Sequence, residues 1–201
     1  MSEHQTLWTV GHSTRSAEQF AELLKAHGVL RVADVRTTPG SRKFPHFGAA
    51  EMAKWVPAAG IAYEPFKELG GRRRARKDSI NLGWRNESFR GYADYMQTPE
   101  FADGIERLIE VARQKPTVIM CAEAVPWRCH RSLIGDAMLV RGWTVMDIMS
   151  VTSAKAHALT TFAKVEGIKI VYPGEQTLFD SGPTSTEPEP WREPAPRKRG
   201  R

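Results

Sequence analysis

The chain has 201 residues, of which 41% are hydrophobic and 26% are charged, proportions that are ordinary for a soluble globular protein. No window approaches the roughly 20 consecutive apolar residues that a membrane-spanning helix needs. The N-terminus also lacks the basic and then apolar pattern of a signal peptide, so we expect a cytoplasmic protein. Two cysteines are too few for a disulfide framework, and both thiols are expected to be reduced.

The net charge is +6, and its position in the sequence matters more than its size. Residues 174–201 contain five basic and five acidic side chains, so the whole excess belongs to the preceding part. An anionic substrate or partner is the expected consequence, although solubility alone explains the same excess. Because residues 174–201 are rich in Pro, Glu, Ser and Thr, we predict a single α/β domain over 1–173 followed by a disordered tail with a basic end.

Strand-like and helix-like segments alternate along the domain. Strands are expected at 7–10, 29–33, 61–63, 117–120, 143–148 and 169–172, and helices at 16–28, 49–56, 99–112 and 132–140. Strands separated by helices indicate βαβ units, and so an α/β fold in which a mainly parallel sheet has helices on both faces, a three-layer Rossmann-like sandwich. Residues 70–86 form the one long irregular stretch, which is typical of a functional or mobile loop.

Polar side chains follow three of the predicted strands. They are, in chain order, His12 and Ser13, then Asp34 and Arg36, then the segment 121–131. Because ligands bind beyond the carboxyl ends of parallel strands in open α/β sheets, this convergence predicts a pocket at that edge. Any one of these strand ends could be only a turn or a helix cap, and Ser13 has that alternative.

The charged side chains at this edge are candidates for substrate binding and proton transfer. Arg36 and Arg131 can bind a phosphate or carboxylate through two parallel N–H donors. Asp34 and Arg36 have the spacing of residues on one side of a strand, so they form a structural ion pair or hold a substrate together. Glu123 is a candidate general acid or base just beyond a buried strand, and the alternative is that it neutralises a neighbouring arginine.

Both cysteines lie in the segment 121–131. Cys129 precedes a helix N-terminus with His130 and Arg131 beside it, an environment that activates a thiol; the alternative is a small residue packed under the loop. Cys121 ends a buried strand and is interpreted as a core residue. A zinc site is not expected, because the seven residues between the cysteines exceed the usual spacing of two to four and because adjacent Cys129 and His130 do not readily bind one ion.

Several motifs together resemble a known family. They are Gly11-His12-Ser13, Asp34-Val35-Arg36, Leu69-Gly70-Gly71, Phe89 with Tyr92 and Tyr95-Met96, Cys121-Ala122-Glu123 and Cys129-His130-Arg131. In this order they are similar to the prokaryotic family called domain of unknown function 488, over about Leu7–Pro173. His157 also resembles a position of that family. The resemblance implies an α/β sandwich with a shared pocket, and it implies no reaction.

Two functions from different classes are compatible with these observations. The first is an enzyme that acts on a phosphorylated, nucleotide-like or nucleic-acid substrate, with catalysis by residues among Glu123, Asp34, His12, Cys129 and His130 and binding by Ser13, Arg36 and Arg131. The second is a non-catalytic nucleic-acid-binding protein, with contacts from Arg72, Arg73, Arg74, Arg76 and Lys77 and with Trp84 and Phe89 as stacking surfaces. Gly-rich dinucleotide and phosphate-binding loop motifs are absent, and the sequence leaves any cofactor unknown.

Overall fold

The computed structural model describes residues 5–40 and 42–174. The predicted disordered tail therefore lies outside the described residues, apart from Gly174. Within the described residues no helix is long and apolar enough to cross a membrane.

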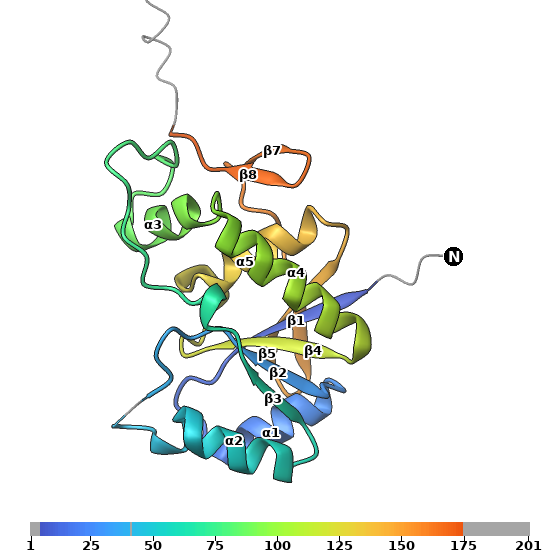
Figure 1. Cartoon of the computed structure of the whole chain (residues 1–201). Coiled ribbons are helices and arrows are strands. Elements are labelled where there is room, and N and C mark those ends of the chain that lie inside the picture. The colour runs from blue at the N-terminus through green and yellow to red at the C-terminus, as the bar shows by residue number, and fades with distance from the viewer. Residues whose placement is uncertain (1–4, 41, 175–201) are drawn as a thin grey trace, which may run out of the picture.

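A six-stranded sheet forms the centre of the molecule (Figure 1). Its strands are β1 (Thr6–Gly11), β2 (Arg31–Asp34), β3 (Ala62–Pro65), β4 (Thr117–Cys121), β5 (Thr144–Ser150) and β6 (Ser153–Ala156). Their order is β3-β2-β4-β1-β5-β6; the first five are parallel, and β6 runs antiparallel to β5 at one edge. The predicted mainly parallel sheet is confirmed.

Helices cover both faces of this sheet (Figure 1). They are α1 (Ala17–Ala26), α2 (Ala49–Ala58), α3 (Glu87–Tyr95), α4 (Pro99–Gln114) and α5 (Arg131–Leu139). Buried side chains of α1 and α2 pack against one face, and those of α4 and α5 pack in a separate cluster against the other. The fold is therefore the three-layer α/β sandwich that the alternation of elements predicts.

The helix starts predicted at residues 16 and 99 are also confirmed. Ser16 caps α1, accepting a hydrogen bond from the Gln19 backbone while the Gln19 side chain accepts one from Ser16. Thr98 caps α4, and Pro99 occupies its first turn, where a missing N–H costs nothing. These caps fix where each helix leaves its preceding loop.

Part of the element pattern differs from the prediction. The segment predicted as the last strand is β8 (Lys169–Val171), but it pairs with β7 (Lys164–Glu166) in a separate two-stranded hairpin and does not join the main sheet. Helix α3 and strand β6 were not predicted, because both are short and rich in polar or small residues. The part of the chain that the structure describes also contains three single-turn 3-10 helices: η1 (Pro45–Phe47), η2 (Lys67–Leu69) and η3 (Pro126–Arg128).

The loops after β1 and β4 lie against each other at the carboxyl edge. The His12 backbone N–H donates to the Cys121 carbonyl at 2.9 Å, and the Ser13 N–H donates to the Ala122 carbonyl at 3.0 Å. Gly11 allows this approach, since a Cβ there would lie 1.7 Å from the Glu123 carbonyl oxygen. Two of the predicted polar segments are therefore in direct contact.

Candidate active site

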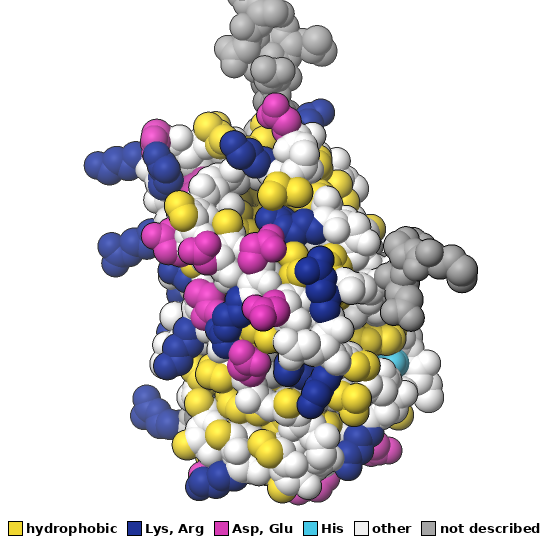
Figure 2. Space-filling view, turned by 45° about the vertical axis from the view of Figure 1, so that its right-hand side comes forward, with side chains coloured by type: hydrophobic (Ala, Val, Ile, Leu, Met, Phe, Trp, Pro, Cys, Tyr) yellow, Lys and Arg dark blue, Asp and Glu magenta, His cyan; other side chains and the backbone are white. Residues whose placement is uncertain are grey.

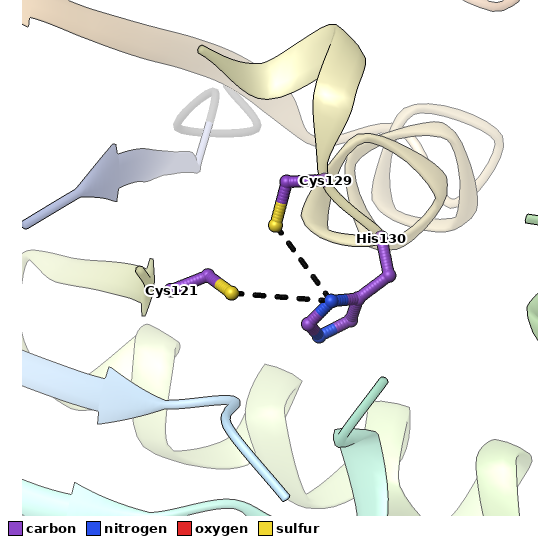
Figure 3. A group of neighbouring side chains, drawn as sticks. All are labelled: Cys121, Cys129 and His130. Atoms are coloured by element: carbon purple, nitrogen blue, oxygen red, sulfur yellow. Dashed lines mark hydrogen bonds between the residues drawn. The ribbon is translucent and has the colours of Figure 1, made fainter. Parts of the chain in front are cut away.

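Two sulfur atoms and one imidazole nitrogen meet at the end of β4 (Figure 3). Cys121 is the last residue of β4, Cys129 follows η3, and His130 caps α5. His130 Nδ1 lies 4.0 Å from Cys121 Sγ and 3.7 Å from Cys129 Sγ. Both cysteines are buried. Although Cys129 and His130 are adjacent in the sequence, both side chains face one point, together with Cys121. Whether they bind one ion, which the sequence analysis did not expect, stays a prediction.

The orientation of the His130 ring is fixed from its other side. Its Nε2 lies 2.9 Å from the Val35 carbonyl oxygen, a group that only accepts hydrogen bonds. Nε2 therefore carries the proton and donates it, and the lone pair of a neutral ring is left on Nδ1, facing the two sulfurs. The backbone just after β2 thus orients a nitrogen base on the thiol pair.

The two thiols have opposite acid strengths. A hydrogen bond from Cys129 lowers the pKa of Cys121 even though burial opposes the charge. The bond to Cys121, and then burial, raises the pKa of Cys129. Cys121 is therefore the member of the pair that ionises first, whereas the sequence assigned that role to Cys129. Cys121 is a buried core residue, as predicted, and it also contacts a second thiol and a histidine, which the sequence did not indicate.

Asp34 and Arg36 form the structural ion pair that their spacing allows. Arg36 donates from Nε to Asp34 Oδ1 at 2.8 Å and from Nη2 to Asp34 Oδ2 at 2.6 Å, a bidentate arrangement. Tyr63 Oη also donates to Asp34 Oδ2, at 2.7 Å. Burial lowers the pKa of Arg36, but the bonds and charge of Asp34 outweigh it and raise that pKa. Arg36 is thus largely neutralised by Asp34.

His12 lies on the other side of Arg36. Arg36 Nη1 lies 3.3 Å from His12 Nε2, and His12 Nδ1 lies 2.9 Å from the Ser13 carbonyl oxygen. Burial, and then the charge of Arg36, lowers the pKa of His12 to about 4. The neutral ring therefore accepts from Arg36 and donates to Ser13, so it holds the arginine. Its part in catalysis stays a prediction.

Arg131 is committed to the loop between β4 and α5. Its Nη1 donates to the Glu123 carbonyl at 2.6 Å and its Nη2 to the Ala124 carbonyl at 3.0 Å, while its buried Nε has no partner among the described residues. The side chain is fully enclosed. Direct contact between this guanidinium and a substrate would require the loop to open.

Arg15 was not predicted from the sequence. Its Nη1 donates to the Gly11 carbonyl at 2.8 Å, and burial together with the charge of Arg131 lowers its pKa. Neither arginine forms an ion pair with any residue that the structure describes. The position of Arg15 directly after the Gly11–Thr14 turn is the sequence feature that could have marked it as a candidate site residue.

Two further predicted residues border this cluster. Ser13 has a φ of 54°, a left-handed conformation that costs a non-glycine residue about 1–2 kcal/mol. Such strain persists where the surrounding structure enforces it, often at functional sites. Glu123 lies on the loop after β4 with an exposed side chain, so the solvated position differs from the partly desolvated one expected of it.

Comparison with models of protein families shows to which family the chain belongs. The model described as domain of unknown function DUF488 matches residues 16–138, more than half of the sequence. The chain belongs to this DUF488 family. The matched region includes Asp34, Arg36 and the whole segment 121–131, and it excludes His12 and His157. No curated protein and no solved structure matches the chain.

The basic loop of this DUF488 chain is only partly free. Arg73 donates to the Glu68 and Gly70 carbonyls and lies 3.6 Å from the centre of the Tyr95 ring. Arg76 pairs with Asp78 at 2.8 Å on the surface. The remaining cations of the loop are exposed: Arg72, with a left-handed φ of 59°, Arg74 and Lys77.

Charges of both signs are mixed on the face of the molecule that Figure 2 shows. Figure 2 shows Lys and Arg side chains interspersed with Asp and Glu on the face toward the viewer, with further basic side chains projecting at its border. A mixed surface of this kind does not by itself mark a nucleic-acid footprint. The attraction of an anion must be argued from individual arginines.

A second buried polar cluster surrounds His157. Its Nδ1 lies 2.9 Å from Asp147 Oδ2, and its Nε2 lies 3.3 Å from Asp136 Oδ1. Asp136 also accepts from Thr160 and from Tyr172 Oη, at 2.7 and 2.8 Å. The cluster borders a pocket of about 400 Å³ whose wall includes Trp127 of the segment 121–131. Sequence reasoning named His157 but not its two carboxylate partners, which come from β5 and α5.

Proposed function

We propose that the protein is an enzyme whose active site lies at the carboxyl edge of the sheet, around Cys121, Cys129 and His130. It acts on a small anionic substrate of the phosphorylated or nucleotide-like kind. The observation that carries this proposal is the pair of uncompensated guanidinium groups, Arg15 and Arg131, beside the thiol cluster.

The electrostatic argument starts from the cost of burying like charges. Arg131 is enclosed and Arg15 is partly buried, and the positive charge of Arg131 disfavours that of Arg15. No carboxylate among the described residues pairs with either arginine to offset this repulsion. An anion bound there would relieve this repulsion. Because carbonyl groups hold Arg131, it would attract the anion through its positive charge without touching it. Arg15 is accessible enough to contact the anion with its planar N–H donors.

The reactive groups lie beside that positive charge. Arg131 is close enough to Cys129, and Arg36 is close enough to Cys121, for each arginine to interact electrostatically with its neighbouring sulfur. Glu123 is on the same loop with its carboxyl group in solvent, where it can exchange protons with a bound substrate. The strained Ser13 completes the edge at the end of β1.

The alternative, a non-catalytic nucleic-acid-binding protein, has less support. Base stacking needs an open aromatic face. Trp84 and Phe89 instead stack on each other, with ring centres 4.7 Å apart, and Phe162 and Tyr172 contact the same indole. Arg72, Arg74 and Lys77 alone would give binding through phosphates without base contacts.

The proposal is tested by calorimetric binding of pyrophosphate and ATP to wild type and to R15Q. A hydrogen bond to a charged group contributes about 1.5–3 kcal/mol, so R15Q should weaken binding by roughly tenfold to a hundredfold. The matched control is R113Q, which removes the same charge from an exposed position at the end of α4. Equal affinities for all three proteins, or no binding to wild type, would refute the anion site.

Catalysis needs a separate readout. Wild type and E123Q are incubated with a panel of nucleotides, sugar phosphates and short oligonucleotides, and products are identified by mass spectrometry. We expect conversion of at least one compound by wild type and a loss of about 100-fold or more in E123Q, the usual range for a general acid or base. Binding without conversion of any anion would favour a binding protein.

A further inference from the structure

We propose that Cys121, Cys129 and His130 form a binding site for a thiophilic transition-metal ion such as Zn²⁺, with one coordination position left for water or substrate. Metal binding follows from these three residues alone. The use of the open position in catalysis rests on the proposed function.

The first argument is the distance between the ligand atoms. Cys121 Sγ, Cys129 Sγ and His130 Nδ1 all lie within 4.8 Å of one another. A tetrahedral zinc ion with Zn–S near 2.3 Å and Zn–N near 2.0–2.1 Å requires sulfur and nitrogen to be about 3.6 Å apart. The observed separations of 3.7 and 4.0 Å meet this within a few tenths of an ångström, which side-chain rotation supplies.

The second argument is the orientation of the imidazole. Metal-binding histidines usually donate their other ring N–H to a carbonyl or carboxylate, which fixes the tautomer and the ring plane. His130 has this arrangement, with Nε2 donating to the Val35 carbonyl. The ring therefore presents Nδ1 to the sulfurs without any rearrangement.

Gly71 adds a steric condition next to that nitrogen. A Cβ at this position would lie 2.8 Å from His130 Nδ1 and 3.1 Å from Cε1. The face of the His130 ring beside Nδ1 is therefore bordered by a residue without a side chain, and a Cβ there would press on the ring. Gly71 acts as a positioning residue for His130.

The donor set selects the class of ion. Two thiolates and one imidazole are soft or borderline ligands, which favour Zn²⁺, Fe²⁺ or Cu⁺ over Mg²⁺ and Ca²⁺. Among the described residues, the group contains three ligands and no fourth. Three protein ligands with an open position are typical of catalytic zinc sites, whereas structural sites have four.

Cobalt substitution is the direct test on the full-length protein. Metal-free, reduced protein is titrated with Co²⁺, and the thiolate-to-cobalt charge-transfer band and the visible bands of a tetrahedral ion are recorded. We expect saturation at one ion per chain and displacement of cobalt by Zn²⁺. C121S and H130N should each weaken cobalt binding by at least about tenfold, while H27N, a histidine outside the cluster, should leave it unchanged.

A second measurement does not depend on the folding of any variant. In wild type, Zn²⁺ should protect both Cys121 and Cys129 from iodoacetamide, as measured by peptide mass spectrometry.

The variant G71A tests the positioning of His130. It should weaken cobalt binding about tenfold to a hundredfold, the usual effect of disturbing the partner of a ligand. G40A is its control, because a Cβ there meets nothing within 4 Å.

The outcomes separate this proposal from the proposed function. Absence of a thiolate-to-cobalt band in reduced wild type, or a Cys121–Cys129 disulfide in protein purified without air, would overturn the metal site. The anion affinities of wild type and R15Q are measured on metal-free protein, so they stand whichever way the cobalt titration ends. Cobalt binding without anion binding would support the metal site and refute the proposed substrate class.

Discussion

The buried His157 predicts a loss of stability at alkaline pH. Burial alone would lower its pKa, but hydrogen bonds and charge from Asp136 and Asp147 outweigh burial and raise it to about 9, from an ordinary value of 6.5. A group whose pKa is higher in the folded protein stabilises it while both states are protonated. This stabilisation is complete below pH 6.5 and is lost as the pH rises through about 9.

The magnitude follows from the size of the shift. A difference of about 2.5 pH units at 1.36 kcal/mol per unit is roughly 3 kcal/mol of unfolding free energy. Little of this is screened by solvent, because the side chain is only 7% exposed between the two carboxylates. The charged and titratable groups that face it are Asp147 from β5 and Asp136 from α5, with Tyr172 donating to the latter.

Urea denaturation of wild type and H157N at pH 6 and pH 10 measures this contribution. H157N should be less stable than wild type at both pH values, because it leaves two buried carboxylates without their cation. Groups elsewhere in the protein titrate equally in both proteins, so their contributions cancel in the difference. The difference in unfolding free energy should therefore shrink by about 3 kcal/mol between pH 6 and pH 10. A difference that stays constant with pH would show that His157 is not a buried imidazolium.

Three further predictions test the frame of the site and its location. G11A should destabilise the protein by at least about 3 kcal/mol in urea unfolding, because its Cβ would overlap the Glu123 carbonyl, while G40A should stay within about 0.5 kcal/mol of wild type. D34N should cost about 3–5 kcal/mol, because it leaves the buried Arg36 without its counterion; an unchanged melting curve would contradict the ion pair. The exposed cations of the basic loop are neutralised by R72Q, R74Q and K77Q. These changes should leave the affinity for pyrophosphate within about twofold of wild type, and a larger loss would place the anion site at that loop.

The sheet could be predicted from the sequence because buried parallel strands are apolar runs between amphipathic helices. The strand 117–120 and the helix from Pro99 have this pattern over their whole length. Helix α3 and strand β6 do not, since their place is set by packing against the domain and by pairing with β5. The strand predicted at 169–172 was grouped with the main sheet, and its partner β7 was not predicted, because a short apolar run carries no information about its partner strand.

The site was predicted in place but not in detail. The spacing of Asp34 and Arg36 in an extended strand is enough to put both side chains on one side, and the ion pair follows. The meeting of Cys121, Cys129 and His130 depends on η3, which returns the chain to the end of β4. The backbone also changes from extended at Cys129 to helical at His130, so the usual alternation of neighbouring side chains does not apply there.

The central claim is that the anion site and the thiol cluster are one active site. It is tested by the rate at which iodoacetamide modifies Cys121 and Cys129 in metal-free protein, with and without pyrophosphate at a concentration that saturates wild type. We predict that the bound anion slows modification of both thiols in wild type, and that the same concentration has little effect in R15Q. Unchanged modification rates in wild type with pyrophosphate bound would show that the anion and the thiols occupy separate places.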